Sequence, residues 1–328
     1  MMKSFAYVRP ATLDEATARL AKPGARACAG GTDLLGCLRD EVFEADTVVS
    51  LGALARAGQG IPKGITSAGG GLSIGALTTL AEIARDDRIR ASYTALAEGA
   101  GAAASPQLRN QGTLGGNLCQ RPRCWFFRGE YHCARKGGDT CFAIHGDNRY
   151  HCIFGGGPCF IVHPSDTAPA LVALGAAARI AGPNGGGRTV PLDAFFVLPA
   201  QDATRENVLQ PGEVIVEVSL PAAPTRSTYR KARARRSWDF ALAGAAVALT
   251  MKGERVERAR VVLSGVAPIP WRAKASEAAL VGNDLDAKTI RRAAVAAVEG
   301  ADPMTDNAYK VALTRGVVED ALAAVLGA

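Results

Sequence analysis

Six of the eight cysteines lie between Cys119 and Cys159, directly after a glycine-rich run at residues 108–117. Thiolates are soft ligands that bind zinc, copper(I) or iron–sulfur clusters. Backbone amides in a glycine-rich turn instead bind anionic groups, such as the phosphates of a dinucleotide. The two neighbouring patterns therefore predict a redox protein in which a metal centre and an anionic cofactor lie side by side.

The six clustered cysteines are separated by four, eight, seven, ten and six residues, and no pair has CxxC spacing. Zinc ribbons and bacterial ferredoxin motifs contain such tight pairs, so the pattern differs from both. Four thiolates on a long loop need only converge in space, which permits a cluster. Two alternatives stay open: unliganded cysteines in a core, and a zinc site that also uses a histidine. The histidines available for zinc are His132, His145, His151 and His163.

Two glycine-rich segments could approach a phosphate closely. The first follows a predicted strand and precedes a predicted helix, so its amides would converge on one point. The alternative there is an ordinary turn with Asp33 as a helix cap. The second adds hydroxyl and amide donors for phosphate or ribose oxygens. The candidate residues are Ala29, Gly30, Gly31, Thr32 and Asp33 in the first segment and Arg109, Asn110, Gly112, Thr113, Gly115, Gly116 and Asn117 in the second.

The elements that would position these segments belong to three consecutive α+β blocks. In the first block, Thr12 and Glu15 have the spacing of a capping box and predict a helix to about Leu20. Strands are predicted at residues 25–29 and 47–51, on either side of the first glycine turn and its helix. No G-x-G-x-x-G fingerprint follows a predicted strand, which argues against a Rossmann domain.

A glycine-rich bridge at residues 58–71 leads into the second block, which begins with the strand LSIGAL. Thr79 and Glu82 predict a second capped helix, and another helix is expected at about 92–104. A helix and a strand follow in DTAPALVALGAAARI, and EVIVEVSLP alternates as a strand does.

The third block starts near Thr228. It contains two strand-like runs, AAVALTM and ARVVLSGV, and ends in helices near 287–299 and 307–326.

Composition excludes several classes of protein. Apolar residues are 48% and charged residues 21% of the 328, as in a globular protein large enough for two or three domains. The net charge of +7 is not matched by a nucleic-acid-binding motif, and the basic run at residues 231–236 is isolated. Neither a secretory signal nor a membrane-spanning apolar stretch is found, so no membrane insertion is expected. The expected compartment is the cytoplasm, with export to the periplasm on a partner's signal as the alternative.

Three segments carry a resemblance to a known family: AGGTDLL at 29–35, LRNQGTLGGNL at 108–118 and HPSDTAPALVALGA at 163–176. With them the chain resembles, over essentially its whole length, the FAD-binding medium subunits of molybdenum hydroxylases such as xanthine dehydrogenase. The segment NLCQRPRCWFFR and the cysteines after it resemble an insertion found in one branch of the family. That branch includes the flavoprotein subunits of 4-hydroxybenzoyl-CoA reductase and periplasmic aldehyde oxidoreductase, which carry an additional [4Fe-4S] cluster.

The resemblance implies an α+β fold. Residues 1–57 and 58–224 would form a two-part FAD-binding domain of the vanillyl-alcohol-oxidase (PCMH-like) type, with an iron–sulfur insertion at 119–160. Residues 225–328 would form a C-terminal domain like that of carbon monoxide dehydrogenase flavoproteins. The resemblance places the FAD pyrophosphate against residues 29–33 and 112–117. It adds Asp166 and Lys231 as further flavin contacts.

The resemblance also implies the cluster ligands and the function. The implied ligands are Cys124, Cys133, Cys141 and Cys159, with Cys152 as a substitute for Cys159. The function implied is electron transfer between a partner [2Fe-2S] small subunit and an external acceptor, while a molybdenum-cofactor large subunit oxidises the substrate. The alternative is a stand-alone flavin oxidase with a zinc-stabilised loop.

Overall fold

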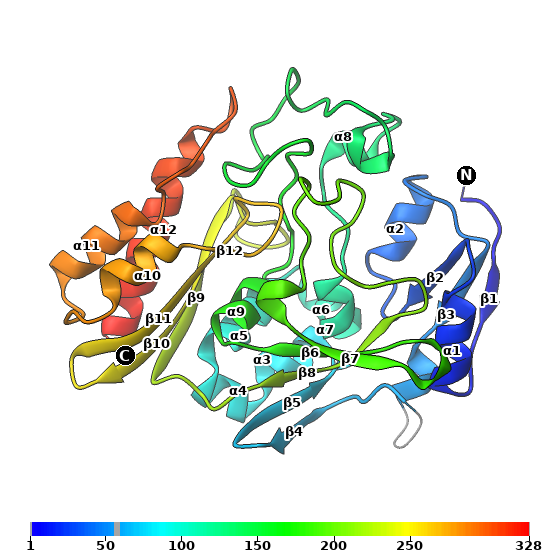
Figure 1. Ribbon diagram of the computed structural model, residues 1–328, viewed down its shortest axis with the longest axis horizontal. Coiled ribbons are helices and arrows are strands. Elements are labelled where there is room, and N and C mark those ends of the chain that lie inside the picture. The colour runs from blue at the N-terminus through cyan, green and yellow to red at the C-terminus, as the bar shows by residue number, and fades with distance from the viewer. Residues whose placement is uncertain (1, 56–59, 328) are drawn as a thin grey trace.

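Three separate β-sheets organise the chain, of which the computed structural model describes residues 2–55 and 60–327 (Figure 1). The N-terminal sheet is parallel, in the order β1-β3-β2. Its elements are β1 (Ala6–Val8), α1 (Leu13–Leu20), β2 (Ala25–Cys28), α2 (Leu34–Arg39), β3 (Thr47–Ser50) and the 3-10 turn η1 (Gly52–Ala55). The first glycine turn therefore connects β2 to α2, as predicted.

The capping box predicted for α1 forms only in part. Thr12 Oγ1 accepts from the amide of Glu15 at 3.2 Å, but the Glu15 carboxylate accepts from the amide of Ala11 and not from that of Thr12. The predicted box at the start of α3 forms completely, with Thr79 and Glu82 bonded in both directions. Local capping signals thus located both helix starts.

The middle sheet is antiparallel, in the order β4-β5-β8-β6-β7. Its strands are β4 (Ile65–Ala68), β5 (Gly71–Gly75), β6 (Ala177–Ala181), β7 (Gly187–Pro191) and β8 (Val214–Leu220). β4 lies inside the predicted glycine-rich bridge, where no strand was expected. The first predicted domain boundary, between 57 and 58, lies outside the described residues, and the division of the chain into domains stays a prediction.

Short helices fill the space above the middle sheet. They are α3 (Leu80–Arg85), α4 (Asp87–Ser92), α5 (Thr94–Ala102), α6 (Pro106–Gln111), α7 (Leu114–Leu118) and α9 (Thr167–Ala173), with the 3-10 turns η3 (Pro183–Gly185) and η4 (Leu192–Ala194) further along. α5 and α9 also contact the C-terminal sheet, so they form a shared layer between the two sheets. One hydrophobic core accordingly runs from the N-terminal sheet through the middle sheet to β9 and β10.

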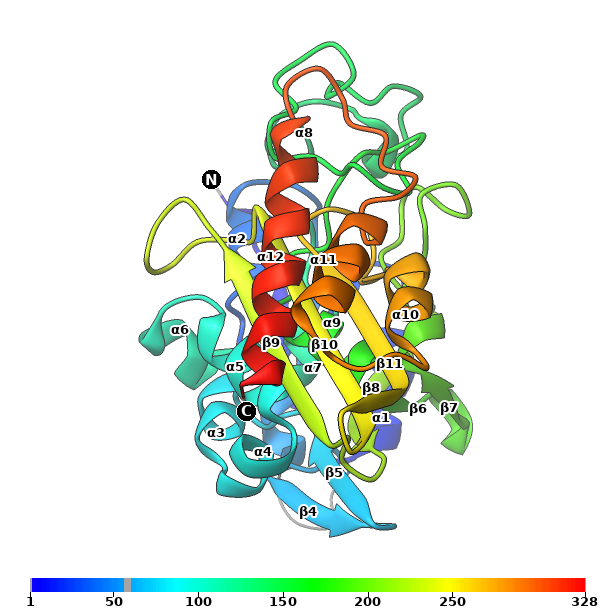
Figure 2. The same ribbon diagram turned by 90° about the vertical axis from the view of Figure 1, so that its left-hand side faces the viewer.

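The C-terminal sheet is antiparallel, with strands β9 (Arg226–Ala232), β10 (Ala243–Lys252), β11 (Arg255–Ser264) and β12 (Trp271–Arg272). Figure 2 shows α10 (Lys274–Leu280), α11 (Ala287–Ala296) and α12 (Tyr309–Leu326) on its outer face. Because helices cover both faces, the first seven residues of β10 are all buried. Part of the basic run at residues 231–236 belongs to β9, which was not predicted as a strand.

Residues 119–160, the cysteine segment, contain only α8 (Trp125–Arg128) and the 3-10 turn η2 (Ala134–Lys136). Figure 1 shows this segment at the top of the molecule, above the gap between the N-terminal and C-terminal sheets. It connects α7 to α9 and lies beside the first glycine turn. No helix in the described part of the chain is long and apolar enough to cross a membrane.

Candidate functional site

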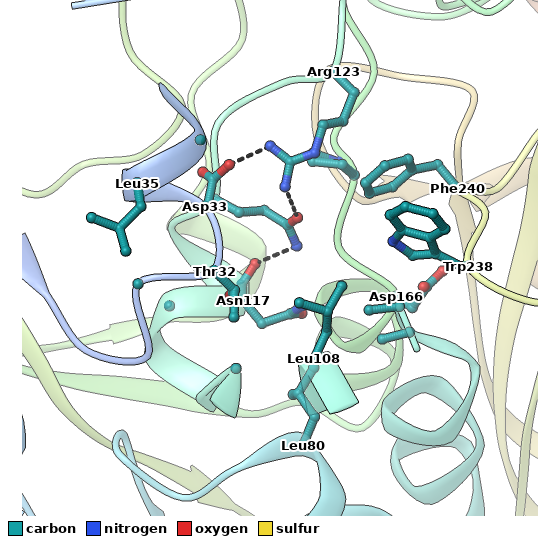
Figure 3. A pocket seen from close by; sticks show the side chains of 18 of the residues that line it. Thr32, Asp33, Leu35, Leu80, Leu108, Asn117, Arg123, Asp166, Trp238 and Phe240 are labelled. Atoms are coloured by element: carbon teal, nitrogen blue, oxygen red, sulfur yellow. Dashed lines mark hydrogen bonds and ion pairs between the residues drawn. The ribbon is translucent and has the colours of Figure 1, made fainter. Parts of the chain in front are cut away.

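The main cavity, about 630 Å³ in volume, opens between the two glycine segments and the loop that joins β9 to β10 (Figure 3). A smaller chamber of about 290 Å³ adjoins it on the side of β2. Gly31, Thr32, Thr113 and Gly116 are walls of both. Each volume is close to or within the usual range for small-ligand sites. Two chambers with common walls form an elongated site that suits a dinucleotide.

The first glycine turn presents unbonded backbone donors to this site. Gly31 has φ +71°, which glycine adopts without strain, and Gly30 packs so closely that a Cβ there would lie 1.9 Å from the carbonyl oxygen of Gln111. The amides of residues 31–33 have no acceptor among the described residues. Adjacent free amides of this kind bind anions.

The second glycine segment differs from the predicted turn, because it is mostly helical. Thr113 caps α7, and its hydroxyl accepts from the amide of Gly116 at 3.2 Å. The amides of Leu114 and Gly115 donate to the carbonyls of Thr78 and Ala76, both at 2.9 Å. The fold therefore uses these amides itself, and a ligand meets side chains and close-approach positions here.

Only some predicted residues of the second segment line the main cavity: Gly112, Thr113, Gly116 and Asn117. Arg109 lies in α6 and donates to the carbonyl of Ala103 at 2.8 Å, and Asn110 follows it in the same helix. Gly115 faces the middle sheet, where a Cβ would lie 3.1 Å from that of Ala76. Arg109, Asn110 and Gly115 line neither chamber.

Asn117 is held in one orientation by two hydroxyls. Its Oδ1 accepts from Ser165 Oγ at 2.5 Å and from Thr167 Oγ1 at 2.6 Å. With its oxygen bonded in this way, the amide nitrogen is left without an acceptor among the described residues. Asn117 therefore offers two N–H donors to a ligand in the main cavity.

Asp33 does not cap α2 through its side chain, which the sequence offered as the alternative role. Its carboxylate accepts from the amide of Arg121 at 2.7 Å and pairs with the guanidinium groups of Arg123 and Arg128. Burial raises the pKa of Asp33, but these charges and hydrogen bonds outweigh burial and hold the pKa below its ordinary value. Asp33 thus joins the first glycine turn to the cysteine segment.

Asp166 and Lys231, both predicted as flavin contacts, pair with one another. Lys231 Nζ lies 2.7 Å from Asp166 Oδ2, and the hydroxyl of Tyr229 donates to Asp166 Oδ1 at 2.7 Å. Both charged side chains are almost fully buried, and only Asp166 lines the main cavity. Burial, with the charge of Asp166, raises the pKa of Tyr229 well above its ordinary value, so its hydroxyl remains a donor.

Among the lining residues of the main cavity that the sequence did not mark as cofactor contacts are Gln120, Arg123, Trp238 and Phe240. Gln120 bridges the carbonyl of Asn117 and the Arg123 guanidinium (Figure 3). Trp238 and Phe240 come from the β9–β10 loop and are 61% and 44% exposed. Two large aromatic residues, two positions apart and just after the basic run at 231–236, were the available signal for them.

All four cysteines implied as cluster ligands line one small enclosed space of about 10 Å³. Its other walls include Phe126, Phe127, Phe142, Arg135 and His151. Cys119 instead lines the smaller chamber beside β2, and Cys152 is buried nearby without lining the enclosed space. Within the described residues, no group of three or more His, Cys, Asp or Glu side chains is arranged to hold a metal ion.

The electrostatics of this cysteine pocket favour one thiolate. A hydrogen bond from Cys159 lowers the pKa of Cys141 below its ordinary value, and the same bond raises that of Cys159. Burial raises the pKa of Cys124 to about 11, and its sulfur lies 3.3 Å from Nε2 of His151. The charge of buried Arg135 opposes the rise at Cys159. A fixed cation beside the pocket therefore offsets part of the cost of thiolate charge.

Comparison with known proteins covers the whole chain. Residues 3–223 match the family described as FAD binding domain in molybdopterin dehydrogenase, and residues 227–325 match the carbon monoxide dehydrogenase flavoprotein C-terminal domain. The aldehyde oxidoreductase FAD-binding subunit PaoB of Escherichia coli K12 is 35% identical over 98% of both chains. The carbon monoxide dehydrogenase medium chain of Hydrogenophaga pseudoflava is 29% identical over 97% of this chain and 96% of its own.

Solved structures agree with these matches. Carbon monoxide dehydrogenase from Hydrogenophaga pseudoflava superimposes with a TM-score of 0.78 at 28% identity, covering 100% of this chain and 99% of the other. Quinoline 2-oxidoreductase from Pseudomonas putida 86 gives 0.75 at 26% identity, covering 100% and 98%. The predicted α+β architecture is confirmed, and FAD is the cofactor for which the larger domain family is named. The chain belongs to the molybdenum hydroxylase family, as one of its FAD-binding medium subunits.

Proposed function

We propose that this chain binds FAD and a [4Fe-4S] cluster and transfers electrons within a molybdenum-containing oxidoreductase of several subunits. The observation that carries the proposal is the convergence of Cys124, Cys133, Cys141 and Cys159 around one space. Sequence spacing alone does not require these four to meet. The pocket lies beside the main cavity, because Arg123 lines that cavity and is followed in the chain by Cys124.

The main cavity fits FAD by its shape and its donors. The free amides of residues 31–33 would bind the pyrophosphate, and the amide nitrogen of Asn117 would add a side-chain donor. Asp166 would face the cofactor with its charge already neutralised by Lys231. FAD supplies an exchange between single electrons and electron pairs, and the protein supplies position and electrostatics.

The cysteine pocket has the donor set of an iron–sulfur cluster. Because its space is only about 10 Å³ and its thiols are not arranged around a metal ion, the walls would have to move outward as a cluster binds. Four thiols and three phenylalanine rings are among its walls. Four cysteine thiolates are the usual ligands of a [4Fe-4S] cluster, which supplies one-electron transfer when bound. Of the two residues considered for the fourth position, Cys159 lines the pocket and Cys152 does not, which supports Cys159.

The partners follow from the relatives. Those relatives are described as medium chains and as an FAD-binding subunit, which are parts of larger assemblies. By analogy, a molybdenum-cofactor large subunit would oxidise the substrate and a [2Fe-2S] small subunit would pass electrons to this chain. An external acceptor would then remove them. We place this assembly in the cytoplasm.

The test is purification of the chain under strictly anaerobic conditions, followed by iron, sulfide and flavin analysis. We expect equal amounts of iron and acid-labile sulfide, bound FAD, and a cluster signal in electron paramagnetic resonance spectra after reduction. Zinc in place of iron would support the flavin oxidase with a zinc-stabilised loop. Protein that binds flavin but neither iron nor sulfide would refute the cluster.

A further inference from the structure

A second cavity, which we call the aromatic pocket, lies between the cysteine segment and the β9–β10 loop. Its volume is about 560 Å³, within the range of small-ligand sites. Arg123, Asp239 and Phe240 are walls of both the aromatic pocket and the main cavity. Cys124 is also one of its walls. The aromatic pocket therefore adjoins both candidate cofactor sites, and the proposed function leaves it without a role.

Aromatic rings form much of the wall. The rings of Trp125 and Tyr150 meet edge to face with centroids 5.6 Å apart, and His151 lies 6.0 Å from Trp125. Trp125, Tyr150 and Phe240 are 37%, 44% and 44% exposed. Large rings gathered at an accessible surface mark a binding site for a flat, apolar molecule. The remaining walls are mostly aliphatic, namely Ile161, Val162, Ala234, Ala241 and Leu242.

Two guanidinium groups provide the polar contacts. Arg123 lies over the ring of Phe240 at 5.1 Å, and Arg235 lies over the ring of Trp238 at 5.7 Å. The carboxylate of Asp239 is occupied by the amides of Arg235 and Phe240, at 3.0 Å and 3.1 Å. Arg123 uses its two terminal nitrogens on Asp33, Gln120 and the carbonyl of Arg121, and Arg235 uses Nη2 on the carbonyl of Trp238. Nε of both arginines and Nη1 of Arg235 have no acceptor among the described residues, so the pocket combines apolar walls with these N–H donors, which suits a ring that carries carbonyl oxygens.

We propose that the aromatic pocket binds a quinone, which acts as the external electron acceptor. This inference rests on the proposed function, because the electrons come from reduced FAD in the main cavity. Reduced FAD, when bound in the main cavity, would supply two electrons and two protons and so be oxidised. A quinone in the aromatic pocket would take them up, and its two carbonyl oxygens would become hydroxyl groups. The arginine side chains would hold the carbonyl oxygens as negative charge develops on them.

Other acceptors fit the aromatic pocket less well. A nicotinamide dinucleotide has a pyrophosphate, which is usually bound by glycine-rich backbone, and no described residue that lines the pocket is a glycine. An acceptor protein is far larger than the pocket and could only dock over its mouth. A flat, uncharged ring with two carbonyl groups matches both the walls and the donors.

The test measures binding of 2-methyl-1,4-naphthoquinone to the oxidised, flavin-loaded full chain by isothermal titration calorimetry. Oxidised flavin cannot reduce the quinone, so the readout is binding and not activity. Ala241→Phe would fill the pocket and is expected to weaken binding by about tenfold or more. Arg235→Gln, at an exposed position, is expected to weaken it by about threefold. The matched control, Ala91→Phe on the exposed side of α4, should bind as the wild type does.

A second measurement follows the oxidation of reduced flavin by the same quinone in a stopped-flow spectrometer. Its rate should fall in Ala241→Phe and Arg235→Gln in parallel with affinity. Flavin and iron content are determined for every sample. Wild-type protein without flavin would defeat the proposed function itself. Flavin-loaded wild type that does not bind the quinone, or that binds NAD instead, would overturn the quinone site alone. Equal binding by wild type and both pocket variants would also overturn it.

Discussion

The main cavity and the cysteine pocket are neighbours, but they are built differently. The main cavity is bounded by segments next to regular elements: the turn between β2 and α2, the start of α7 and the loop between β9 and β10. The cysteine pocket lies in a segment with two very short helices. Backbone hydrogen bonds therefore fix the first site, whereas the second depends on side chains from elsewhere in the molecule.

Those side chains come from three directions. Asp33 accepts from three arginine residues at the start of the cysteine segment. Glu206 pairs with Arg135 and Arg121, at 2.9 Å each. From the C-terminal domain, Lys310 Nζ donates to the carbonyl of Tyr150 at 3.0 Å. One site is therefore preformed by the fold, while the other is held together by long-range polar contacts, which a bound cluster would complete.

Loss of a cluster ligand should have the largest effect. Cys141→Ser is expected to remove nearly all iron and sulfide while FAD remains bound, because Cys141 lines the cysteine pocket but neither chamber of the flavin site. Metal analysis and flavin absorbance measure the two separately. Cys119→Ser and Cys152→Ser are the controls and should keep their iron. Full iron in Cys141→Ser, or loss of iron in Cys152→Ser with retention in Cys159→Ser, would reassign the ligands.

Gly116→Val should have the opposite effect, which is loss of flavin with retention of iron. A Cβ at Gly116 meets only Thr113 Oγ1, at 3.1 Å, and the larger side chain would extend into the two chambers that Gly116 lines. We expect flavin occupancy to fall by about tenfold or more, with iron retained. Flavin released by denaturation, divided by protein concentration, gives the occupancy. Normal occupancy would show that the start of α7 does not contact the cofactor.

Asp33→Asn tests the link between the two sites. Removing a largely buried charge that faces two arginines should lower the free energy of unfolding by about 2–3 kcal/mol in urea titrations near pH 7. The pKa of Asp33 lies below its ordinary value of 3.8 in the folded protein, so its stabilising effect is present above that pH and is lost as the pH falls through the folded pKa. The difference between variant and wild type should therefore stay constant from pH 8 to pH 5 and shrink below about pH 4. Asp40→Asn, at the exposed C-terminal end of α2, is the control and should change stability little.

Lys310→Met should have the smallest effect. Lys310 is fully buried, and burial lowers its pKa to about 7 from 10.5. The unfolded chain therefore binds an extra proton between these values, and the lysine stabilises the fold more as the pH rises through them. Near pH 7 the lost hydrogen bonds and the relieved charge should nearly cancel, leaving about 1 kcal/mol or less. From pH 7 to pH 10 the free energy of unfolding of the wild type should rise relative to that of Lys310→Met. A difference between the two that does not change with pH would contradict the lowered pKa.

Several features of the fold could be predicted because they depend on neighbours in the sequence. Thr79 and Glu82 marked the start of α3, alternating apolar residues marked β8, and strand-like runs marked β10 and β11. β9 was not predicted, because Lys231 at its end belongs to a basic run that suggested a solvent-exposed segment. The charge of Lys231 is buried only because Asp166, far away in sequence, neutralises it.

The second glycine segment, at the candidate site, also depends on distant residues and so could not be predicted from local sequence. Its composition suggested a loop, yet the carbonyls of Thr78 and Ala76 accept from its amides and Thr113 caps it, so it folds as α7. The role of Asp33 was also hidden, because its arginine partners lie about ninety residues further along the chain. Likewise, Trp238 and Phe240 reach the main cavity only because β9 and β10 carry their loop there.

By itself, the sequence determined the types of donor this protein offers, four or more thiols and two glycine segments, and the elements that local hydrogen bonding and alternation dictate. The tertiary structure decided which donors meet. It brought Cys124, Cys133, Cys141 and Cys159 to one pocket and left Cys119 and Cys152 outside it. The physical reason is that an irregular segment takes its shape from ion pairs and packing with distant residues, and no local pattern in the sequence encodes those contacts.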